Sequence, residues 1–572
     1  MAAQQGKKNS TNAKKDSSKP EKNLLLRYAV PLLITAVLMV YLPTLRLGFT
    51  ELDDSIFIKE QKAYNQDLSN LITSFKRGVF NPTEDVYYRP LLLNSFILNY
   101  QISGEDISGW HLVNVLLHLA AVLLLFYLLR KIGLNEVSTL LLTLFFAIHP
   151  VLSQAVAWIP GRNDTLLAIF TFGFLLSVFK YVEENKIGWL LLQGMLLLCA
   201  LFTKETAVFA APVAWVLLVL MKDQKVFSPR MWFMYVTWLA GGLIWFYIRS
   251  EATLKNEQLQ AADMLTTLPT RLIVLIQYLG KILLPVKLSV FPILQDTSNV
   301  YGFIALALLA VVFFFTRNRN WKVIGAGLAI YLLFFIPALL VPASLNDQDF
   351  EHRTYLPMMG MLIVLSETVL LRNKLSQSVL LLCGLAVCVV LSIMNVNHQN
   401  NFKDPVTFWT AAVNTSPHSA YANMMLGARI DKVDRQRSEE LIRKSYELDS
   451  TEKYINYYMG VMLQEHDSVL ASESYFQKEI RKSDYYMCYF HLARVAFEKG
   501  DKLSAISQLE TFLDRAPADP QANNNLLLLY LDTKQNDKAR ELVQRMKSFG
   551  MEVPPAIEQQ LNAAASSPES EK

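Results

Sequence analysis

Hydrophobic residues along the first two thirds of the chain occur in long blocks that contain almost no charge. Between Arg27 and Asn395 these blocks are roughly 17 to 22 residues long, the length that an α-helix needs to cross about 30 Å of hydrocarbon. After Phe402 such blocks stop. The pattern predicts an all-α protein in which a polytopic bundle of transmembrane helices is followed by a water-soluble region.

About eleven blocks qualify as membrane spans by length. They lie near residues 24–47, 110–130, 134–149, 164–182, 187–203, 205–221, 231–249, 300–316, 322–342, 355–371 and 376–396. One more block, 272–284, is short, contains Lys281 and precedes Pro285. We interpret it as an interfacial or re-entrant helix.

Charge between the blocks orients the predicted bundle. Lysine and arginine clusters fall on one face under this count, at 7–27, 130–131, 180–186, 222–230, 317–322 and 372–374. The positive-inside rule makes that face cytoplasmic. We therefore expect a cytoplasmic N-terminus, and we expect the region after the last span to lie on the opposite side.

Small residues recur in the C-terminal third with a period typical of tetratricopeptide repeats. Ser438, Ser472, Ala505 and Ala539 are spaced 34, 33 and 34 residues apart. Each repeat is a helical hairpin, and stacked hairpins form an α-solenoid with a concave groove. The expected groove residues are Tyr421, Asn423, Tyr454, Tyr457, Tyr485, Tyr489 and Asn524. They suit an extended acceptor peptide, although for any single tyrosine we favour packing between helices.

Composition divides the chain into four predicted regions. They are a disordered cytoplasmic tail (1–23), a transmembrane domain (24–397) with a first external loop (48–109), a repeat domain (398–550) and a flexible C-terminal tail (551–572). The net charge of +4 is dispersed between apolar blocks, which argues against nucleic acid as a partner. The four cysteines have no disulfide or metal-ligand spacing.

Two adjacent acids, Asp53 and Asp54, follow the first predicted span. Adjacent carboxylates repel unless a divalent cation, a cationic side chain or a shared proton relieves the repulsion. A hydrated loop whose acids only face water has the same composition. Both interpretations stay open from these residues alone.

Six charged residues and one tyrosine border the same predicted face, at the outer ends of separate spans. They are Arg89, Arg162, Asp164, Lys204, Glu205, Arg353 and Tyr355. Arginine and lysine are natural partners of phosphate, so Arg162, Lys204 and Arg353 could converge on a lipid phosphate. Each cation alone is also explained by contact with lipid headgroups.

Polar residues near these clusters have supporting roles in this interpretation. They are His111, Asn114, His149, Glu351 and His352. His111, Asn114 and His118 share one helical stripe, and a polar side chain at membrane depth usually faces a cavity or a partner. For His118 we favour a hydrogen-bonded residue inside the bundle.

These motifs, taken in order, resemble a known family. They are Asp53-Asp54, Tyr-Arg-Pro-Leu (88–91), His-Leu-Val-Asn-Val-Leu-Leu-His (111–118), Ala-Ile-His-Pro-Val (147–151), Ala-Val-Ala-Trp-Ile-Pro-Gly-Arg-Asn-Asp (155–164), Lys204-Glu205 and His-Arg-Thr-Tyr-Leu-Pro (352–357). Together with C-terminal repeats they resemble the transmembrane and tetratricopeptide-repeat glycosyltransferases of the GT-C superfamily, whose eukaryotic members are protein O-mannosyltransferases.

The resemblance implies a polyprenyl-phosphate or diphosphate sugar as donor and a transfer that inverts the anomeric centre. The acceptor would be the hydroxyl group of a Ser or Thr residue, in a protein held by the repeats. Asp53 or Asp54 would be the catalytic carboxylate, and the cations would stabilise the departing phosphate. GT-C enzymes differ in metal use, so the resemblance leaves Mg²⁺ or Mn²⁺ open, with Asp54 and Asp164 as its ligands. His352 stands where the family pattern suggests a more uniform Glu-Arg motif.

A second interpretation is not enzymatic. In it the chain is a membrane-anchored repeat scaffold that assembles envelope proteins, and the charged residues serve only topology and packing. The two interpretations differ in whether the acids and cations meet in one site. For location we expect a bacterial cytoplasmic membrane with periplasmic repeats; an endoplasmic-reticulum membrane with luminal repeats would show the same topology.

Overall fold

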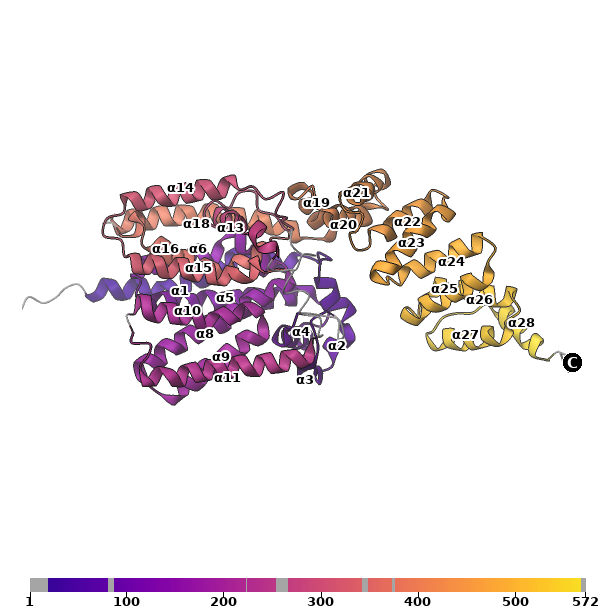
Figure 1. Cartoon of the computed structure of the whole chain (residues 1–572), viewed down its shortest axis with the longest axis horizontal. Coiled ribbons are helices and arrows are strands. Elements are labelled where there is room, and N and C mark those ends of the chain that lie inside the picture. Colours follow the sequence, from indigo (N-terminus) through magenta and orange to yellow (C-terminus); the bar gives the residue numbers. More distant parts are fainter. Residues whose placement is uncertain are drawn as a thin grey trace, which may run out of the picture. The chain divides into compact units, whose positions relative to one another are not determined.

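The computed structural model describes residues 19–80, 87–222, 224–253, 266–341, 348–372 and 376–566. Most of the predicted N-terminal tail and the last residues of the predicted C-terminal tail lie outside these ranges. Every regular element within them is a helix, apart from one isolated bridge between Ile293 and Gln348 (Figure 1). The all-α prediction is confirmed. The chain divides into two compact units, Met1–Ser416 and Pro417–Lys572.

Helices occur at all eleven positions where the sequence predicts a span. They are α1 (Lys19–Tyr41), α5 (Ile107–Ile132), α6 (Glu136–Ile148), α8 (Arg162–Glu184), α9 (Ile187–Thr203), α10 (Ala210–Val216), α11 (Pro229–Ala252), α14 (Val300–Phe315), α15 (Trp321–Leu339), α16 (Tyr355–Ser366) and α18 (Gln377–Gln399). Six helices in the described ranges are long and apolar enough to cross a bilayer, so the chain is a multi-pass membrane protein.

The remaining predicted spans are interrupted or short. α6 bends by 48° into the segment Pro150–Ala157, a geometry that fits either a broken span or a re-entrant loop. Ile187–Thr203, Glu205–Met221 and Val300–Phe315 are apolar but shorter than the others. Pro150 and the extended backbone at Lys204 end helices at residues 148 and 203, close to the boundaries that the sequence predicts for these spans.

The predicted first external loop is folded wherever it is described. It contains η2 (Ile56–Glu60), α2 (Lys62–Gln66), α3 (Asn70–Thr73), η3 (Ser74–Lys76) and α4 (Pro90–Ser103). Phe57, Leu92, Phe96 and Trp110 are buried together in a small core of their own. This core fixes the segment that follows Asp53 and Asp54 against the start of α5.

Two glycine pairs let helices approach closely inside the first unit. A Cβ on Gly327 of α15 would meet the Gly360 carbonyl oxygen of α16 at 2.6 Å. A Cβ on Gly302 of α14 would meet the Ile276 carbonyl oxygen at 2.1 Å. Ile276 lies on α13 (Val274–Leu283), the short helix predicted over 272–284, and most of α13 is buried within the protein.

The second unit consists of successive helix pairs. They are α20 (Ala420–Ile430) with α21 (Arg435–Leu448), α22 (Ile455–Glu465) with α23 (Val469–Ser483), α24 (Met487–Glu498) with α25 (Lys502–Arg515), and α26 (Pro520–Asp532) with α27 (Asn536–Ser548) (Figure 1). Small residues lie where the pairs touch: a Cβ on Gly427 would meet Ile442, and one on Gly460 would meet Phe476. The helices alternate with the spacing that the repeat pattern predicts.

Beyond the last pair, α28 (Pro555–Ser566) occupies the segment predicted as a flexible tail. Val553 and Leu561 are buried in the core of the final repeats. This described part of the tail therefore packs as a terminal helix and covers apolar surface that the last hairpin leaves open.

Candidate functional site

Asp53 and Asp54 have different surroundings, although they are neighbours in sequence. The Asp54 side chain is 1% exposed. One of its carboxylate oxygens accepts hydrogen bonds from the Thr50 backbone N–H at 2.6 Å and the Thr50 hydroxyl at 3.0 Å. The other accepts from the N–H groups of Glu51 at 2.9 Å and Ser55 at 3.0 Å. Asp54 therefore holds the loop that presents Asp53.

The Asp53 carboxyl group is partly buried and lies beside cationic and acidic neighbours. The pKa of Asp53 is raised to about 7, chiefly by burial and also by the negative charge of Asp54, while the nearby Arg89 guanidinium opposes both effects. A carboxyl group with a pKa near 7 is ionised for about half the time at neutral pH and can accept a proton there.

Arg89 and Glu205 form an ion pair between the first loop and the end of α9. The Arg89 Nη2 atom lies 2.9 Å from a Glu205 carboxylate oxygen, and the Nε atom also donates to this group. The guanidinium lies over the Tyr87 ring, 4.8 Å from its centroid. The Glu205 carboxylate and the Tyr87 ring thus fix the direction of the Arg89 side chain.

Asp164 and Lys204 form a second pair, between the first turn of α8 and the end of α9. The Lys204 ammonium donates to both Asp164 oxygens, at 2.7 and 2.9 Å, and to the Asn163 side chain at 3.3 Å. Both partners are almost fully buried. The sequence places Asp164 and Lys204 on the same predicted face, and in the structure their side chains are in contact.

His352 completes this group from η9 (Glu351–Thr354). Its Nε2 atom lies 4.0 Å from an Asp164 oxygen. Its backbone N–H and its Nδ1 atom both lie 3.2 Å from the Gln154 side-chain oxygen, while the Gln154 amide donates to the Val290 carbonyl. Burial lowers the pKa of His352 well below its usual value, and the positive charges of Lys204 and Arg353 lower it further. The ring is therefore neutral, with its proton on Nδ1 and an acceptor nitrogen facing Asp164.

Arg353 lies next to His352 and is partly exposed. It donates to the Gln348 carbonyl at 2.9 Å. Its positive charge also acts on His352, which places it in the same group. Asp53, Arg89, Asp164, Lys204, Glu205, His352 and Arg353 thus meet at one end of the helices, whereas the Lys131–Glu183 ion pair lies at the other ends of α5 and α8.

Arg162 does not offer its guanidinium to this group. It donates to the Asn114 side chain at 2.7 Å, the Asn99 side chain at 2.6 Å, and the carbonyls of Trp110 and Ser95. It is fully buried. The prediction of phosphate contact fails for Arg162 in this arrangement, because these bonds occupy four of the five donors that an arginine carries.

Other predicted site residues also make structural contacts. Asn114 donates to the carbonyls of Val156 and Ile159, and His149 bonds to the Ile282 carbonyl at 2.9 Å. Tyr355 is fully buried and its hydroxyl lies 2.7 Å from His118, so the internal role expected for His118 is confirmed and Tyr355 does not face the site. These side chains hold the broken segment after α6 and the start of α16 in place.

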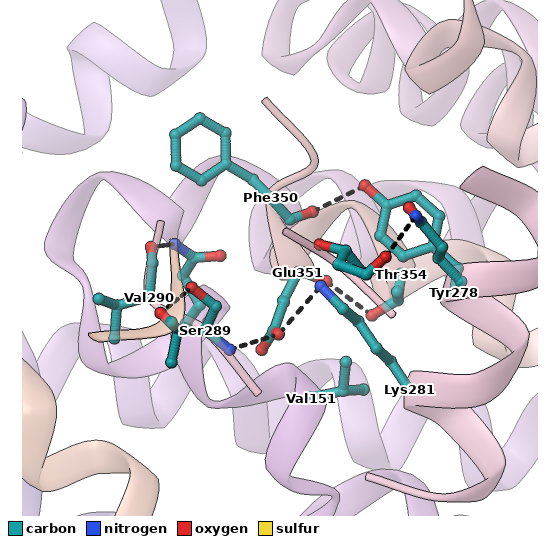
Figure 2. Close-up of polar contacts among 12 residues, drawn as sticks. Val151, Tyr278, Lys281, Ser289, Val290, Phe350, Glu351 and Thr354 are labelled. Carbon is teal, nitrogen blue, oxygen red and sulfur yellow. Dashed lines mark hydrogen bonds and ion pairs between the residues drawn. The ribbon is translucent and has the colours of Figure 1, made fainter. Parts of the chain in front are cut away.

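Two remaining supporting residues lie on either side of the group. His111 is buried beside the backbone of Leu47 and Gly48, directly before the loop of Asp53. Glu351 is 0% exposed and its carboxylate faces Lys281 and Ser289 (Figure 2). Both shape the backbone of the site from outside it.

The predicted metal ligands do not fit a metal ion. The Asp54 oxygens already accept four hydrogen bonds, and both Asp164 oxygens accept from Lys204. Among the described residues no group of three or more His, Cys, Asp or Glu side chains is arranged to hold a metal. A divalent cation would have to displace these bonds, so we assign it no role.

In the repeats, Asn423 is not a groove residue. It is fully buried, and its amide donates to the Pro417 and Ser419 carbonyls. Asn456 and Asn523 bond in the same way to the carbonyls six residues before them, at Ser450 and Pro517. The expectation of peptide contact was wrong for Asn423, because the recurring amide closes the turn before three of the four hairpins.

The predicted groove tyrosines cluster between the second and third hairpins. Tyr485 lies 4.6 Å from Tyr454 and 5.0 Å from Tyr457, ring centroid to ring centroid. Tyr421 and Tyr489 are partly buried, the Tyr489 hydroxyl donates to Asp484, and Asn524 is exposed. The cluster both packs the hairpins together and keeps part of its aromatic surface open.

Sequence reasoning missed four residues that shape the site: Gln154, Lys281, Ser289 and His398. Lys281 carried a signal, since a lysine inside a short apolar helix needs a partner. Gln154, Ser289 and His398 carry no local pattern, because their partners are distant in sequence.

Comparison with known proteins adds an independent observation. Residues 90–248 match the family model described as dolichyl-phosphate-mannose-protein mannosyltransferase. The chain is 34% identical over 175 residues to the protein O-mannosyl-transferase Tmtc1 of Drosophila melanogaster, covering 30% of this chain and 20% of that protein. It is 40% identical over 136 residues to human protein O-mannosyl-transferase TMTC2, covering 22% and 16%.

The matched segment spans only about a fifth of the length of these relatives. A solved structure of ArnT from Cupriavidus metallidurans, bound to undecaprenyl phosphate, aligns with a TM-score of 0.37 and 14% identity over 73% of this chain and 75% of that one. The segment matched by the family model begins at Pro90, the residue after Arg89, and includes Asp164, Lys204 and Glu205. In sequence, therefore, this chain resembles the membrane glycosyltransferases of the protein O-mannosyltransferase type.

Proposed function

We propose that the protein is a membrane glycosyltransferase that moves a sugar from a polyprenyl-phosphate-linked donor to the hydroxyl group of a Ser or Thr residue in an acceptor protein. One observation carries this proposal. Asp53, whose pKa is about 7, lies beside Arg89 in one group with Asp164, Lys204 and Arg353. A scaffold has no need to gather these charges at one end of its helices.

Asp53 is the general base in this proposal. The acceptor oxygen attacks the anomeric carbon, and the hydroxyl proton passes to the Asp53 carboxylate. The bond between that carbon and the phosphate oxygen breaks, and its electron pair leaves on the phosphate. A single displacement of this kind inverts the anomeric centre. A positioned base typically contributes about 10²–10⁴-fold to the rate.

The cations would act on the leaving phosphate. Arg353 is partly exposed and one of its Nη atoms donates to the Gln348 carbonyl, which leaves further N–H groups of the guanidinium to offer. Arg89 and Lys204 are held by Glu205 and Asp164, which fixes their direction. Positive groups fixed in advance stabilise the charge that develops in the transition state.

The remaining parts of the proposal concern location and partners. The charge pattern favours a site on the non-cytoplasmic face, where a lipid-linked donor reaches it from the membrane and the acceptor reaches it from water. We propose a bacterial cytoplasmic membrane, with the second unit on the periplasmic side. Its exposed aromatic surface around Tyr457 and Tyr485 would recruit the acceptor.

The donor half of this proposal is tested with the purified full-length chain in detergent. The chain is mixed with a total lipid extract and a soluble protein fraction from the same cells, and mass spectrometry follows polyprenyl-phosphate sugars. We expect one lipid-linked sugar to disappear and free polyprenyl phosphate to accumulate. Asp53→Asn should consume about 10²-fold less.

Glu105→Gln is the matched control, because Glu105 is an exposed acid of the same loop that pairs only with Lys62 on the surface. It should consume donor like the wild type. If the wild type consumes no lipid-linked sugar, or if Asp53→Asn consumes as much as the wild type, the enzyme proposal is wrong.

A further inference from the structure

Turn η9 carries the two site residues His352 and Arg353. The residue before them, Glu351, contacts residues outside the site. The Glu351 carboxylate is fully buried among residues that do not belong to the site (Figure 2). One oxygen accepts from the Ser289 N–H at 2.8 Å and lies 3.2 Å from the Lys281 ammonium. The other oxygen faces the Nε2 atom of His398, at 3.6 Å.

These three neighbours come from separate elements. Lys281 lies on the short buried helix α13, His398 on the last turn of α18, and Ser289 on the segment between α13 and α14. Lys281 and His398 are themselves 5% and 8% exposed. Glu351 therefore ties η9 to three parts of the first unit that lie outside the group formed by Asp53 and Asp164.

The backbone of the turn is held from the same side. The Tyr278 hydroxyl, one turn before Lys281 on α13, donates to the Phe350 carbonyl at 3.1 Å. The Asp349 N–H donates to the Pro292 carbonyl at 2.9 Å, and the Thr354 hydroxyl donates to the Glu351 carbonyl at 2.7 Å (Figure 2). Helix α13 and the segment after it thus clamp η9 at both its side chain and its backbone.

Of the contacts in this clamp, the ionic contact of Glu351 is the one whose removal costs the most free energy. A buried carboxylate that loses its cation is left without solvent or counter-charge, and the surrounding chain moves to bring it to water. Any such movement of Glu351 also displaces His352 and Arg353, which are the next two residues. A misplacement of about 1 Å in a site can change its activity by about 10²-fold.

We propose that Lys281 and His398 are positioning residues, which act through Glu351 to hold Arg353 and His352 in register with the lipid-phosphate end of the donor. This inference rests on the proposed function and extends it, because it assigns donor affinity to residues that do not touch the donor. Acceptor binding does not depend on this clamp.

The test measures steady-state transfer by the purified full-length chain, with donor lipid and acceptor protein varied separately. Lys281→Met should raise the KM for the lipid donor by about tenfold or more and leave the KM for the acceptor unchanged. Lys281→Arg keeps the charge and should restore donor KM to within about threefold of the wild type. The double variant Lys281→Met with Glu351→Gln removes both charges and should bind donor better than Lys281→Met alone.

Gln277→Leu is the matched control on the same helix. The Gln277 amide donates to the carbonyls of Leu294 and Thr297 and to the Asn299 side chain, away from Glu351. It loosens α13 without touching the clamp, so donor KM should stay within about threefold of the wild type. Thermal unfolding of each variant is recorded in parallel, to separate donor affinity from general stability.

Three results would overturn the inference: an unchanged donor KM in Lys281→Met, an equal rise in donor and acceptor KM, or the same rise in Gln277→Leu. These outcomes leave the proposed function standing, because the wild type still transfers sugar. A wild-type chain that transfers nothing would overturn the proposed function together with this inference.

Discussion

At the scale of single residues, Asp53 and Asp54 divide the work that the sequence assigns to either of them. Asp54 accepts four hydrogen bonds and shapes the loop, whereas Asp53 has a pKa of about 7 and faces Arg89. The sequence identifies the pair but does not say which acid has which role. That difference depends on where Thr50 and Ser55 place their N–H groups.

The pKa of Asp53 predicts a pH profile. Because the ionised carboxylate accepts the proton, kcat/KM should rise about tenfold per pH unit below pH 7 and level off above it. Arg89 lowers the pKa of Asp53, so Arg89→Gln should move the midpoint to higher pH. The measurement is kcat/KM against pH for both proteins. A flat profile in the wild type would contradict Asp53 as the base.

The same pKa predicts how Asp53 affects stability. The folded pKa is raised above that of the unfolded chain, so the folded state binds more protons and loses stability as the pH rises from about 4 to about 7. Asp53→Asn should therefore unfold at a higher temperature than the wild type at pH 8, and at the same temperature below about pH 4. A variant that is less stable at pH 8 would contradict the burial that we assign to Asp53.

Asp54→Asn should behave in the opposite way. An amide can replace only one of the two accepting oxygens, so at least two of the four N–H and O–H donors lose their acceptor. Unfolding free energy should fall by about 1–3 kcal/mol. Thermal unfolding at several pH values measures it, with Asp53→Asn as the comparison.

At the scale of elements, the position of η9 depends on how closely α15 packs against α16. Gly325 and Gly327 lie on the same helix, but only Gly327 lies against the α16 backbone; nothing lies within 4 Å of a Cβ at Gly325. Gly327→Ala should destabilise the protein by about 1–3 kcal/mol through overpacking. Gly325→Ala should be neutral or slightly stabilising, since alanine favours a helix. Equal unfolding temperatures for the two variants would contradict this packing.

The elements show clearly where prediction from sequence succeeds. Apolar block length places a helix at every predicted span, and the small-residue period places the hairpins of the second unit. Neither pattern shows that the Lys204 ammonium pairs with Asp164, or that Arg162 turns inward to Asn99 and Asn114. Such contacts join residues far apart in sequence, and hydrophobic periodicity carries no information about them.

At the scale of the whole molecule, the charge pattern predicts which loops face out of the cell. Glu105, in the first loop, and Asp537, in the second unit, have exposed side chains, and Lys186, between α8 and α9, is also exposed. In intact cells a membrane-impermeant thiol reagent should label Glu105→Cys and Asp537→Cys but not Lys186→Cys, which reacts only after permeabilisation. The unmodified chain gives the background from native cysteines. Labelling of Lys186→Cys in intact cells would reverse the proposed orientation.

The most direct test of the central claim compares the glycopeptides of cells that carry the wild-type chain, Asp53→Asn or Glu105→Gln at equal membrane abundance. The account predicts that one class of O-linked glycopeptides is present with the wild type and with Glu105→Gln and is lost with Asp53→Asn, and the mass lost from each peptide identifies the sugar. Identical glycopeptide profiles in all three would contradict a glycosyltransferase centred on Asp53 and would leave the membrane-anchored repeat scaffold as the better account.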